Sequence, residues 1–194
     1  MKFLVVLAAL VTLVAADFVR VEFKLLEYSN NAGKGLLATG ERCEKNRHCD
    51  PVMTGYVDTE KPLNAWPGPK ADPKTWTSIF DVKDSDFVKV GKIVSRDVCD
   101  ADYTKANLRA EVSDTNRFTS DKKINQFECL SGRDVARNEA SASWSAPKQC
   151  DAKFNPTKVG LTYQWRAFEV SNAACGAAIG KTGPAKKPSS GIFG

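Results

Sequence analysis

The stretch FVRVEFKLLEY, residues 18–28, decides how the rest of the chain is interpreted. Its apolar side chains fall on one side of an extended chain and its charged side chains on the other, the apolar set being Val19, Val21, Phe23 and Leu25. This period-two alternation is typical of a β-strand with one buried and one solvated face. A chain that begins with such a strand needs partner strands from later segments, so the sequence predicts a sheet.

The segment before this stretch, residues 1–16, has the three parts of a secretory signal peptide. Lys2 supplies the basic residue, an apolar run follows, and Val14 and Ala16 suit a cleavage site. The run is shorter than the roughly 20 apolar residues that a membrane-spanning helix needs. No later stretch is apolar for long enough to cross a bilayer. We therefore expect a secreted, soluble, extracellular protein that is cleaved after Ala16.

The rest of the chain has the composition of one globular domain followed by a tail. Hydrophobic residues make up 42% and charged residues 26%, which is ordinary for a soluble domain. The charges are interleaved along the chain, and no run of Lys and Arg is long enough to form a nucleic-acid patch. From residue 176 on, Gly, Ala, Lys, Pro and Ser dominate, a composition that buries too little apolar surface to become ordered. The sequence predicts a domain over residues 17–175, a disordered tail over residues 176–194, and no nucleic-acid partner.

The chain has six cysteines, an even number, which in an oxidising compartment indicates three disulfides. Six cysteines allow 15 pairings. Only one pair is suggested by spacing, because a short turn can close the loop ERCEKNRHC, residues 41–49. The predicted disulfide cysteines are Cys43, Cys49, Cys99, Cys129, Cys150 and Cys175.

Further extended segments follow the first one. Alternation or β-branched and aromatic content predicts strands over residues 76–82, 87–94, 107–112, 124–130 and 159–170, and more weakly over residues 55–61. In NLRAEV, residues 107–112, the apolar side chains are expected to face inward, and Arg109 and Glu111 to face outward. Short strands, polar loops and dispersed cysteines together predict an all-β fold, an antiparallel β-sandwich.

Two segments are ambiguous on sequence alone. Residues 62–74 carry four prolines around Trp66, which predicts a surface loop. Trp66 is then either a recognition residue or a cap over the core. Residues 134–146 allow a helix, but their serines equally allow a loop.

Few residues could support catalysis. The single histidine, His48, lies beside Cys49 in the predicted disulfide loop, so a catalytic triad or a zinc site lacks its partners. We therefore expect no enzyme, with a carboxylate-based hydrolase as the alternative. A calcium site is a further hypothesis, because carboxylate oxygens are calcium ligands and acidic residues lie between the predicted strands. They are Asp81, Asp84, Asp86, Asp100, Asp102 and Asp114. The alternative is that they are solvated turn residues.

Several stretches, in this order, resemble the N-terminal module of Notch ligands (the Delta, Serrate and Jagged family). They are FKLLEYSNNAGKG (residues 23–35) followed by Cys43 and Cys49, then NLRAEVSDTN (residues 107–116), then LTYQWRAFEVSNAACG (residues 161–176). The resemblance implies a C2-like β-sandwich that contacts a Notch-type receptor, phospholipid, or both. It also implies a calcium site in the loop where Asp114 and Asn116 match the family, although Arg117 falls near the place of a further acidic ligand.

The chain departs from the family in ways that narrow the implied function. Glu169 stands where the family has the first cysteine of the DSL domain, and no DSL domain, EGF repeat or membrane anchor follows. The resemblance therefore implies a secreted modulator of Notch signalling that binds a receptor or a membrane. The alternative from a different class is a disulfide-stabilised structural or defence protein with no receptor role.

Overall fold

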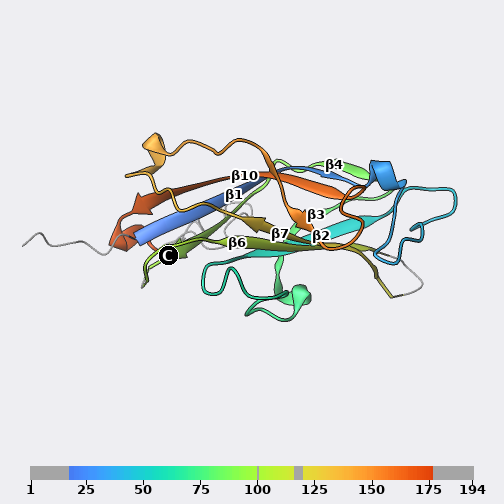
Figure 1. Ribbon diagram of the computed structural model, residues 1–194, viewed down its shortest axis with the longest axis horizontal. Coiled ribbons are helices and arrows are strands. Elements are labelled where there is room, and N and C mark those ends of the chain that lie inside the picture. The colour runs from blue at the N-terminus through green and yellow to red at the C-terminus, as the bar shows by residue number, and fades with distance from the viewer. Residues whose placement is uncertain (1–17, 100, 116–119, 177–194) are drawn as a thin grey trace, which may run out of the picture.

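The opening stretch forms β1 (Phe18–Ser29), the central strand of the first sheet (Figure 1). One edge of β1 pairs antiparallel with β10 (Gly160–Val170) over nearly its whole length. The other edge pairs with β5 (Ile93–Val98) near the start of β1 and with β4 (Phe87–Lys89) near its end. The short β8 (Lys148–Gln149) completes the sheet beyond β10. The described residues are 18–99, 101–115 and 120–176 of this computed structural model.

The second sheet is also antiparallel, in the order β3-β2-β6-β7-β9. Its strands are β2 (Pro51–Asp58), β3 (Thr77–Asp81), β6 (Asn107–Asp114), β7 (Lys122–Leu130) and β9 (Asp151–Ala152). The two sheets pack face to face, and the core lies between them (Figure 1). The antiparallel β-sandwich predicted from the sequence is therefore confirmed.

The alternating residues of β1 and β10 supply one half of this core. Phe23, Leu25 and Leu161 have no exposed surface, and the polar residues between them face outward or pair across the sheet. From the second sheet, Phe127 meets Tyr28 edge-on with ring centroids 6.5 Å apart. Such aromatic contacts stabilise a core beyond the area that they bury.

The ambiguous segments adopt irregular structures. Residues 134–146 contain the 3₁₀ turn η3 (Glu139–Ser141) and an isolated bridge from Ala136 to Phe168, so a longer helix does not form. Instead this segment crosses the outer face of the first sheet, where the Arg166 guanidinium lies 4.6 Å from the centre of the Trp144 ring (Figure 1). The weakly predicted strand at residues 55–61 starts earlier and ends sooner, as Pro51–Asp58, because its full length pairs with β6.

Arg109 faces outward as predicted but is not in contact with water. Its side chain has no exposed surface. It does point away from the core between the sheets, as alternation predicts. The outer face of the second sheet, however, is covered by the proline-rich loop, residues 59–76, which runs beneath β2 and β6 (Figure 1). Trp66 belongs to this covering layer, half-buried, with its ring 5.4 Å from that of Trp76.

The six cysteines form three disulfides: Cys43–Cys49, Cys99–Cys175 and Cys129–Cys150. The pair suggested by spacing is therefore present. A set of this kind indicates folding in an oxidising compartment, which includes the extracellular space. Within the described ranges, no helix is long and apolar enough to span a bilayer. The predicted signal peptide and nearly all of the predicted tail lie outside the described residues.

Candidate anion-binding site at the loop end

The loops between strands gather at the end of the sandwich where β1 finishes (Figure 1). We call them the apical loops: residues 30–50, residues 82–86 and residues 153–159. Backbone and side-chain hydrogen bonds tie the three together, for example from Asn30 N to Asp86 O at 2.7 Å and from Asn155 Nδ2 to Leu37 O at 3.0 Å. The long first loop is therefore part of a fixed surface.

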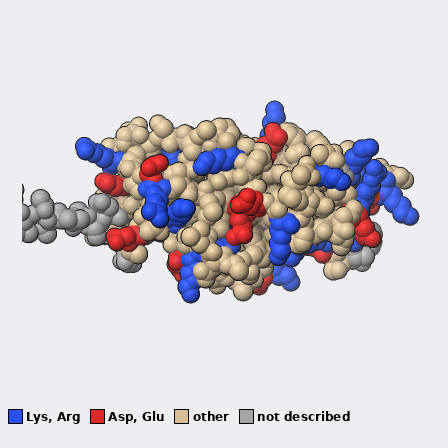
Figure 2. Space-filling view, in the orientation of Figure 1, with Lys and Arg blue, Asp and Glu red and all other residues tan. Residues whose placement is uncertain are grey.

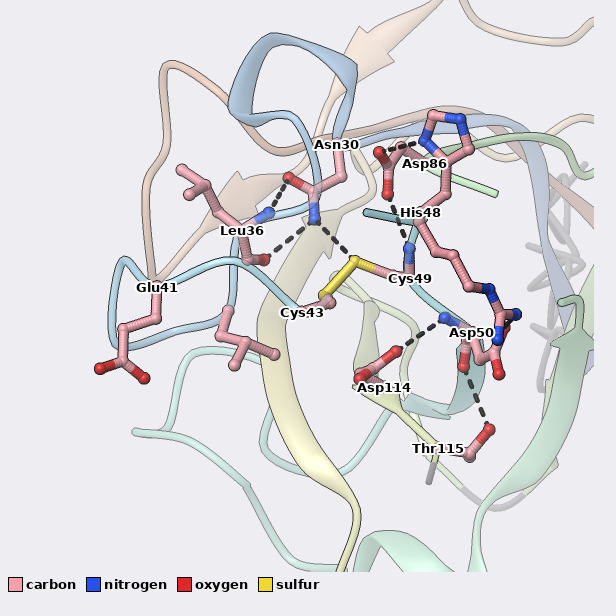
Figure 3. The surroundings of a disulfide bond; sticks show 12 residues. Asn30, Leu36, Glu41, Cys43, His48, Cys49, Asp50, Asp86, Asp114 and Thr115 are labelled. Atoms are coloured by element: carbon pink, nitrogen blue, oxygen red, sulfur yellow. Dashed lines mark hydrogen bonds and ion pairs between the residues drawn. A yellow bond between two sulfur atoms is a disulfide. The ribbon is translucent and has the colours of Figure 1, made fainter. Parts of the chain in front are cut away.

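The Cys43–Cys49 disulfide fixes the first apical loop at its centre (Figure 3). The fully buried Asn30 holds the preceding turn, because its side chain accepts from Leu36 N at 3.1 Å and donates to Leu36 O at 2.9 Å. Cys43 N donates to Gly35 O at 2.8 Å, which closes the loop back on that turn. These bonds satisfy buried polar groups that would otherwise be costly.

Two buried aspartates lie on opposite sides of the disulfide, Asp86 and Asp114 (Figure 3). The Asp86 carboxylate accepts from Cys49 N at 3.1 Å and lies 2.7 Å from His48 Nδ1. The Asp114 carboxylate accepts from Asp50 N at 2.7 Å, and burial raises the pKa of this carboxyl group. Gly35 passes so close that a Cβ on it would lie 2.9 Å from the Asp86 carboxylate. Both carboxylates are thus enclosed by the loop that they hold.

Two further aspartates are joined to the same loop at the surface. Asp50 accepts from Asp84 N at 2.7 Å, and Asp84 accepts from His48 N at 3.0 Å. The Arg47 guanidinium lies 3.5 Å from the Asp50 carboxylate and 3.6 Å from the Asp84 carboxylate. Asp81 pairs with Lys83 at 3.3 Å. The chain's own cations therefore neutralise these surface carboxylates.

Of the aspartates considered for calcium, Asp81, Asp84, Asp86 and Asp114 reach this end of the molecule but do not converge as ligands. Asp102 follows β5 at the opposite end, and Asp100 lies outside the described residues. Within the part of the chain that the structure describes, the one group of metal-ligating type is Cys43, Cys49 and Asp114. Its two sulfur atoms are bonded to each other and are not available to a metal. Asn116 lies outside the described residues. The calcium site at Asp114 and Asn116 stays a prediction.

The apical loops enclose an open hollow of about 540 Å³. Its lining includes four cations and two carboxylates: Lys34, Arg42, Lys45, Arg47, Asp84 and Asp86. All four cations are exposed. Lys34, Arg42 and Lys45 form no ion pair with any of the described residues. Figure 2 shows Lys and Arg side chains gathered at this end of the molecule.

His48 adds a titratable group to the same hollow. Its hydrogen bond to Asp86 raises the pKa of the imidazole above the ordinary value. A protonated His48 would add a fifth cation to the lining. The arrangement suits an anion with several oxygens, such as a phosphate group, because Lys and Arg bind phosphate through charge-assisted hydrogen bonds.

Sequence reasoning did not single out this hollow. Its cations are spread over residues 34–47, with Glu41 and Glu44 among them. The available signal was the short spacing of Cys43 and Cys49, since a disulfide loop rich in basic residues presents them together. The closing of that loop, and the bonds that occupy the neighbouring carboxylates, are properties of the folded structure.

Comparison with known proteins identifies the type of fold. No protein-family model matches the chain, and no curated protein matches its sequence. Among solved structures, a C2 domain protein from Ramazzottius varieornatus matches with a TM-score of 0.74 and 26% identity, over 82% of this chain and 93% of that one. Human GIVD cytosolic phospholipase A2 matches with a TM-score of 0.51 and 12% identity, over 81% of this chain but only 17% of the phospholipase.

These likenesses show that the chain has a C2-domain-like β-sandwich fold. The fold implied by the resemblance to the Notch-ligand module is therefore confirmed. Notch-ligand specificity is not shown by these comparisons. The likeness to the phospholipase concerns the fold alone, because the identity is low and most of that enzyme lies outside the match.

Proposed function

We propose that this protein is a membrane-binding module that docks on anionic phospholipid through the apical hollow, without calcium and without catalysing a reaction. C2-like domains often bind phospholipid membranes. The observation that carries the proposal is the set of cations around one open hollow that form no ion pair within the described part of the chain: Lys34, Arg42 and Lys45. Lipid phosphates are the ligands that such a set attracts.

Lipid binding without calcium is supported by the contacts of the nearby carboxylates, which already have partners within the chain. A calcium ion needs six to eight oxygen ligands. Here Asp86 and Asp114 each hold a backbone N–H, and Asp50 and Asp84 face Arg47. The positive charge that calcium would otherwise supply at a lipid surface is thus already provided by the chain.

The expected strength is moderate and depends on salt. Each Lys or Arg near an anionic bilayer contributes about 1 kcal/mol. The three unpaired cations therefore supply roughly 3 kcal/mol, with Arg47 adding less because it faces two carboxylates. Because the attraction decays over a Debye length of about 8 Å at physiological ionic strength, binding should weaken as salt is added.

Vesicle co-sedimentation tests the proposal. We would measure the mature protein against vesicles of phosphatidylcholine alone and vesicles with 30% phosphatidylserine, in EDTA, alongside an Arg42→Gln/Lys45→Gln variant. Removing two cations should weaken binding to the anionic vesicles by about 2 kcal/mol, or roughly 30-fold. Absence of binding by the unaltered protein would refute the proposal.

A matched variant controls for net charge. Arg133 and Arg137 are exposed and follow the end of β7 that lies away from the apical loops. The change Arg133→Gln/Arg137→Gln removes the same two charges and should leave vesicle binding within about twofold. An equal loss in both variants would mean that net charge, rather than the hollow, drives binding.

A second candidate function, secreted modulation of Notch signalling, rests on the sequence resemblance to the Notch-ligand module. It is tested with the same proteins on immobilised Notch ectodomain. Saturable binding to the ectodomain, unaffected by Arg42→Gln/Lys45→Gln and without any vesicle binding, would favour the receptor over the lipid.

A further inference from the structure

The proline-rich loop, residues 59–76, presents an apolar side chain to solvent. Leu63 is 72% exposed, and among the described residues the only other large hydrophobic of this kind is Ile93, at 40%. Pro62, Ala65 and Trp66 flank Leu63 and are exposed or half-buried. An exposed leucine alone is common. This one differs because the structure holds it in place.

The buried Arg109 fixes the backbone around Leu63. Its guanidinium donates to Asn64 O at 2.7 Å and to Lys61 O at 3.3 Å. The Asn107 side chain donates to Pro62 O at 3.0 Å. Carbonyl groups on both sides of Leu63 are therefore bound by side chains of the central strand β6. Such preorganisation lowers the entropy lost when a loop binds a partner.

Hydrogen bonds and close packing also hold the remainder of the loop. Tyr56 Oη donates to Pro67 O at 2.7 Å, and Trp76 Nε1 donates to Lys70 O at 3.2 Å. Gly68 has a φ of 78° and packs so tightly that a Cβ on it would lie 2.7 Å from Arg109 Nε. The tip at Leu63 is thus mounted on a layer that has little freedom to move.

The charges on this loop are unbalanced toward positive. Lys61, Lys70 and Lys74 are exposed, and none forms an ion pair with a carboxylate of the described residues. The loop's exposed carboxylates are engaged: Glu60 pairs with Arg96 at 3.1 Å, and Asp72 accepts from Lys74 N at 3.0 Å. The loop thus carries an apolar tip and three exposed lysines, of which Lys70 lies 5.4 Å from the centre of the Tyr56 ring.

This composition fits a bilayer better than a protein. Lysine is depleted in protein–protein interfaces. At a membrane surface, lysines contact anionic headgroups while leucine and tryptophan enter the interfacial region. Charge complementarity therefore favours an anionic lipid surface as the partner of this loop.

We propose that the tip around Leu63 is a second membrane contact, which fixes the orientation of the domain on the bilayer. This inference rests on the proposed function, since the apical hollow supplies the first contact. The loop lies below the second sheet and the apical loops lie at the end of the sandwich (Figure 1). Engaging both requires the long axis of the domain to tilt toward the bilayer.

The test compares Leu63→Ser with Ile93→Ser on vesicles containing 30% phosphatidylserine. Burying one leucine side chain is worth about 1.5–3 kcal/mol, so Leu63→Ser should weaken binding by roughly tenfold or more. Ile93 lies on the other sheet, and Ile93→Ser should leave binding within about twofold. Leu63→Trp should strengthen binding, because tryptophan favours the interface. Both positions are exposed, and far-UV circular dichroism checks that the variants fold.

The outcomes separate this inference from the proposed function. If Leu63→Ser binds like the unaltered protein while Arg42→Gln/Lys45→Gln binds weakly, the apical site stands and the second contact is refuted. The exposed leucine then serves another partner, such as a protein. Equal losses for Leu63→Ser and Ile93→Ser would also refute it, since the effect would not be local. No vesicle binding by the unaltered protein would refute both proposals.

Discussion

Arg109 and Arg47 each face two carboxylates, and their surroundings differ sharply. Arg109 has no exposed surface and bonds to Asp58, Glu128 and the carbonyls of the proline-rich loop. The Arg47 side chain is 58% exposed and lies 3.5 Å or more from its two carboxylates. Arginine–carboxylate pairing thus occurs both in the interior and at the surface.

Burial decides what each arginine does. A buried guanidinium that loses its partners leaves uncompensated charge, so the Arg109 network holds structure in place. A solvent-exposed ion pair contributes little stability, typically 0–1 kcal/mol. Arg47 is therefore free to turn toward a ligand with only a small loss of stability, whereas Arg109 is committed to the loop that carries Leu63.

The largest effect is expected from breaking the buried network. Arg109→Met should lower the free energy of unfolding by about 3–5 kcal/mol, because Asp58 is left buried without its counter-ion. Arg47→Met should change it by less than about 1 kcal/mol. Chemical denaturation of both variants measures the difference. Similar values would contradict the distinction drawn between the two arginines.

A smaller loss of stability is expected at the apical end. Cys43→Ser/Cys49→Ser opens a loop with a sequence separation of 6, and a loop this short contributes about 2 kcal/mol to the free energy of unfolding. The same variant should weaken vesicle binding, since the cations of the hollow are no longer held together. Unchanged vesicle binding would show that the disulfide does not organise the hollow.

Removing a carboxylate that faces Arg47 should strengthen vesicle binding. Asp84→Asn removes one of the two carboxylates that face Arg47 and keeps an oxygen for the hydrogen bond from His48 N. A fully freed cation is worth about 1 kcal/mol at an anionic surface, and Arg47 still faces Asp50, so vesicle affinity should rise by at most about fivefold. Co-sedimentation in EDTA measures this. A fall in affinity would indicate that Asp84 itself takes part in binding.

The smallest effect concerns pH. Because its pKa is raised in the folded state by Asp86, His48 contributes stability that is fully present below its unfolded pKa of about 6.5 and is lost as pH rises through the higher folded value. Vesicle binding should follow the same direction, since protonated His48 adds a cation to the hollow. His48→Gln should flatten this part of the pH profile. A profile that is identical in both proteins would exclude His48 from the binding surface.

Sequence patterns predicted the strands whose surroundings are simple. The alternation in β1 and β10 reflects one face in the core and one toward solvent, so the pattern identified both strands. The spacing of Cys43 and Cys49 likewise identified a disulfide that closes locally.

The features that sequence patterns missed depend on contacts between distant segments. Alternation shows which face Arg109 occupies but not that residues 59–76 cover that face, a contact between residues 45 or more positions apart. In the sequence, the apical cations are interleaved with acidic residues, which indicates only a solvated surface of mixed charge. Only the folded loops show that Asp50, Asp84 and Asp86 are occupied, which leaves Lys34, Arg42 and Lys45 without an ion pair to any described residue.

Contact of the apical loops with anionic lipid in the absence of calcium is tested most directly by hydrogen–deuterium exchange of residues 17–194, with and without vesicles containing 30% phosphatidylserine in EDTA. We expect slowed exchange of backbone amides over residues 34–48 and, more weakly, around Leu63. Exchange over residues 131–138, at the other end of the sandwich, should not change. Unchanged exchange over residues 34–48 in the presence of bound vesicles would contradict contact of the apical loops with lipid.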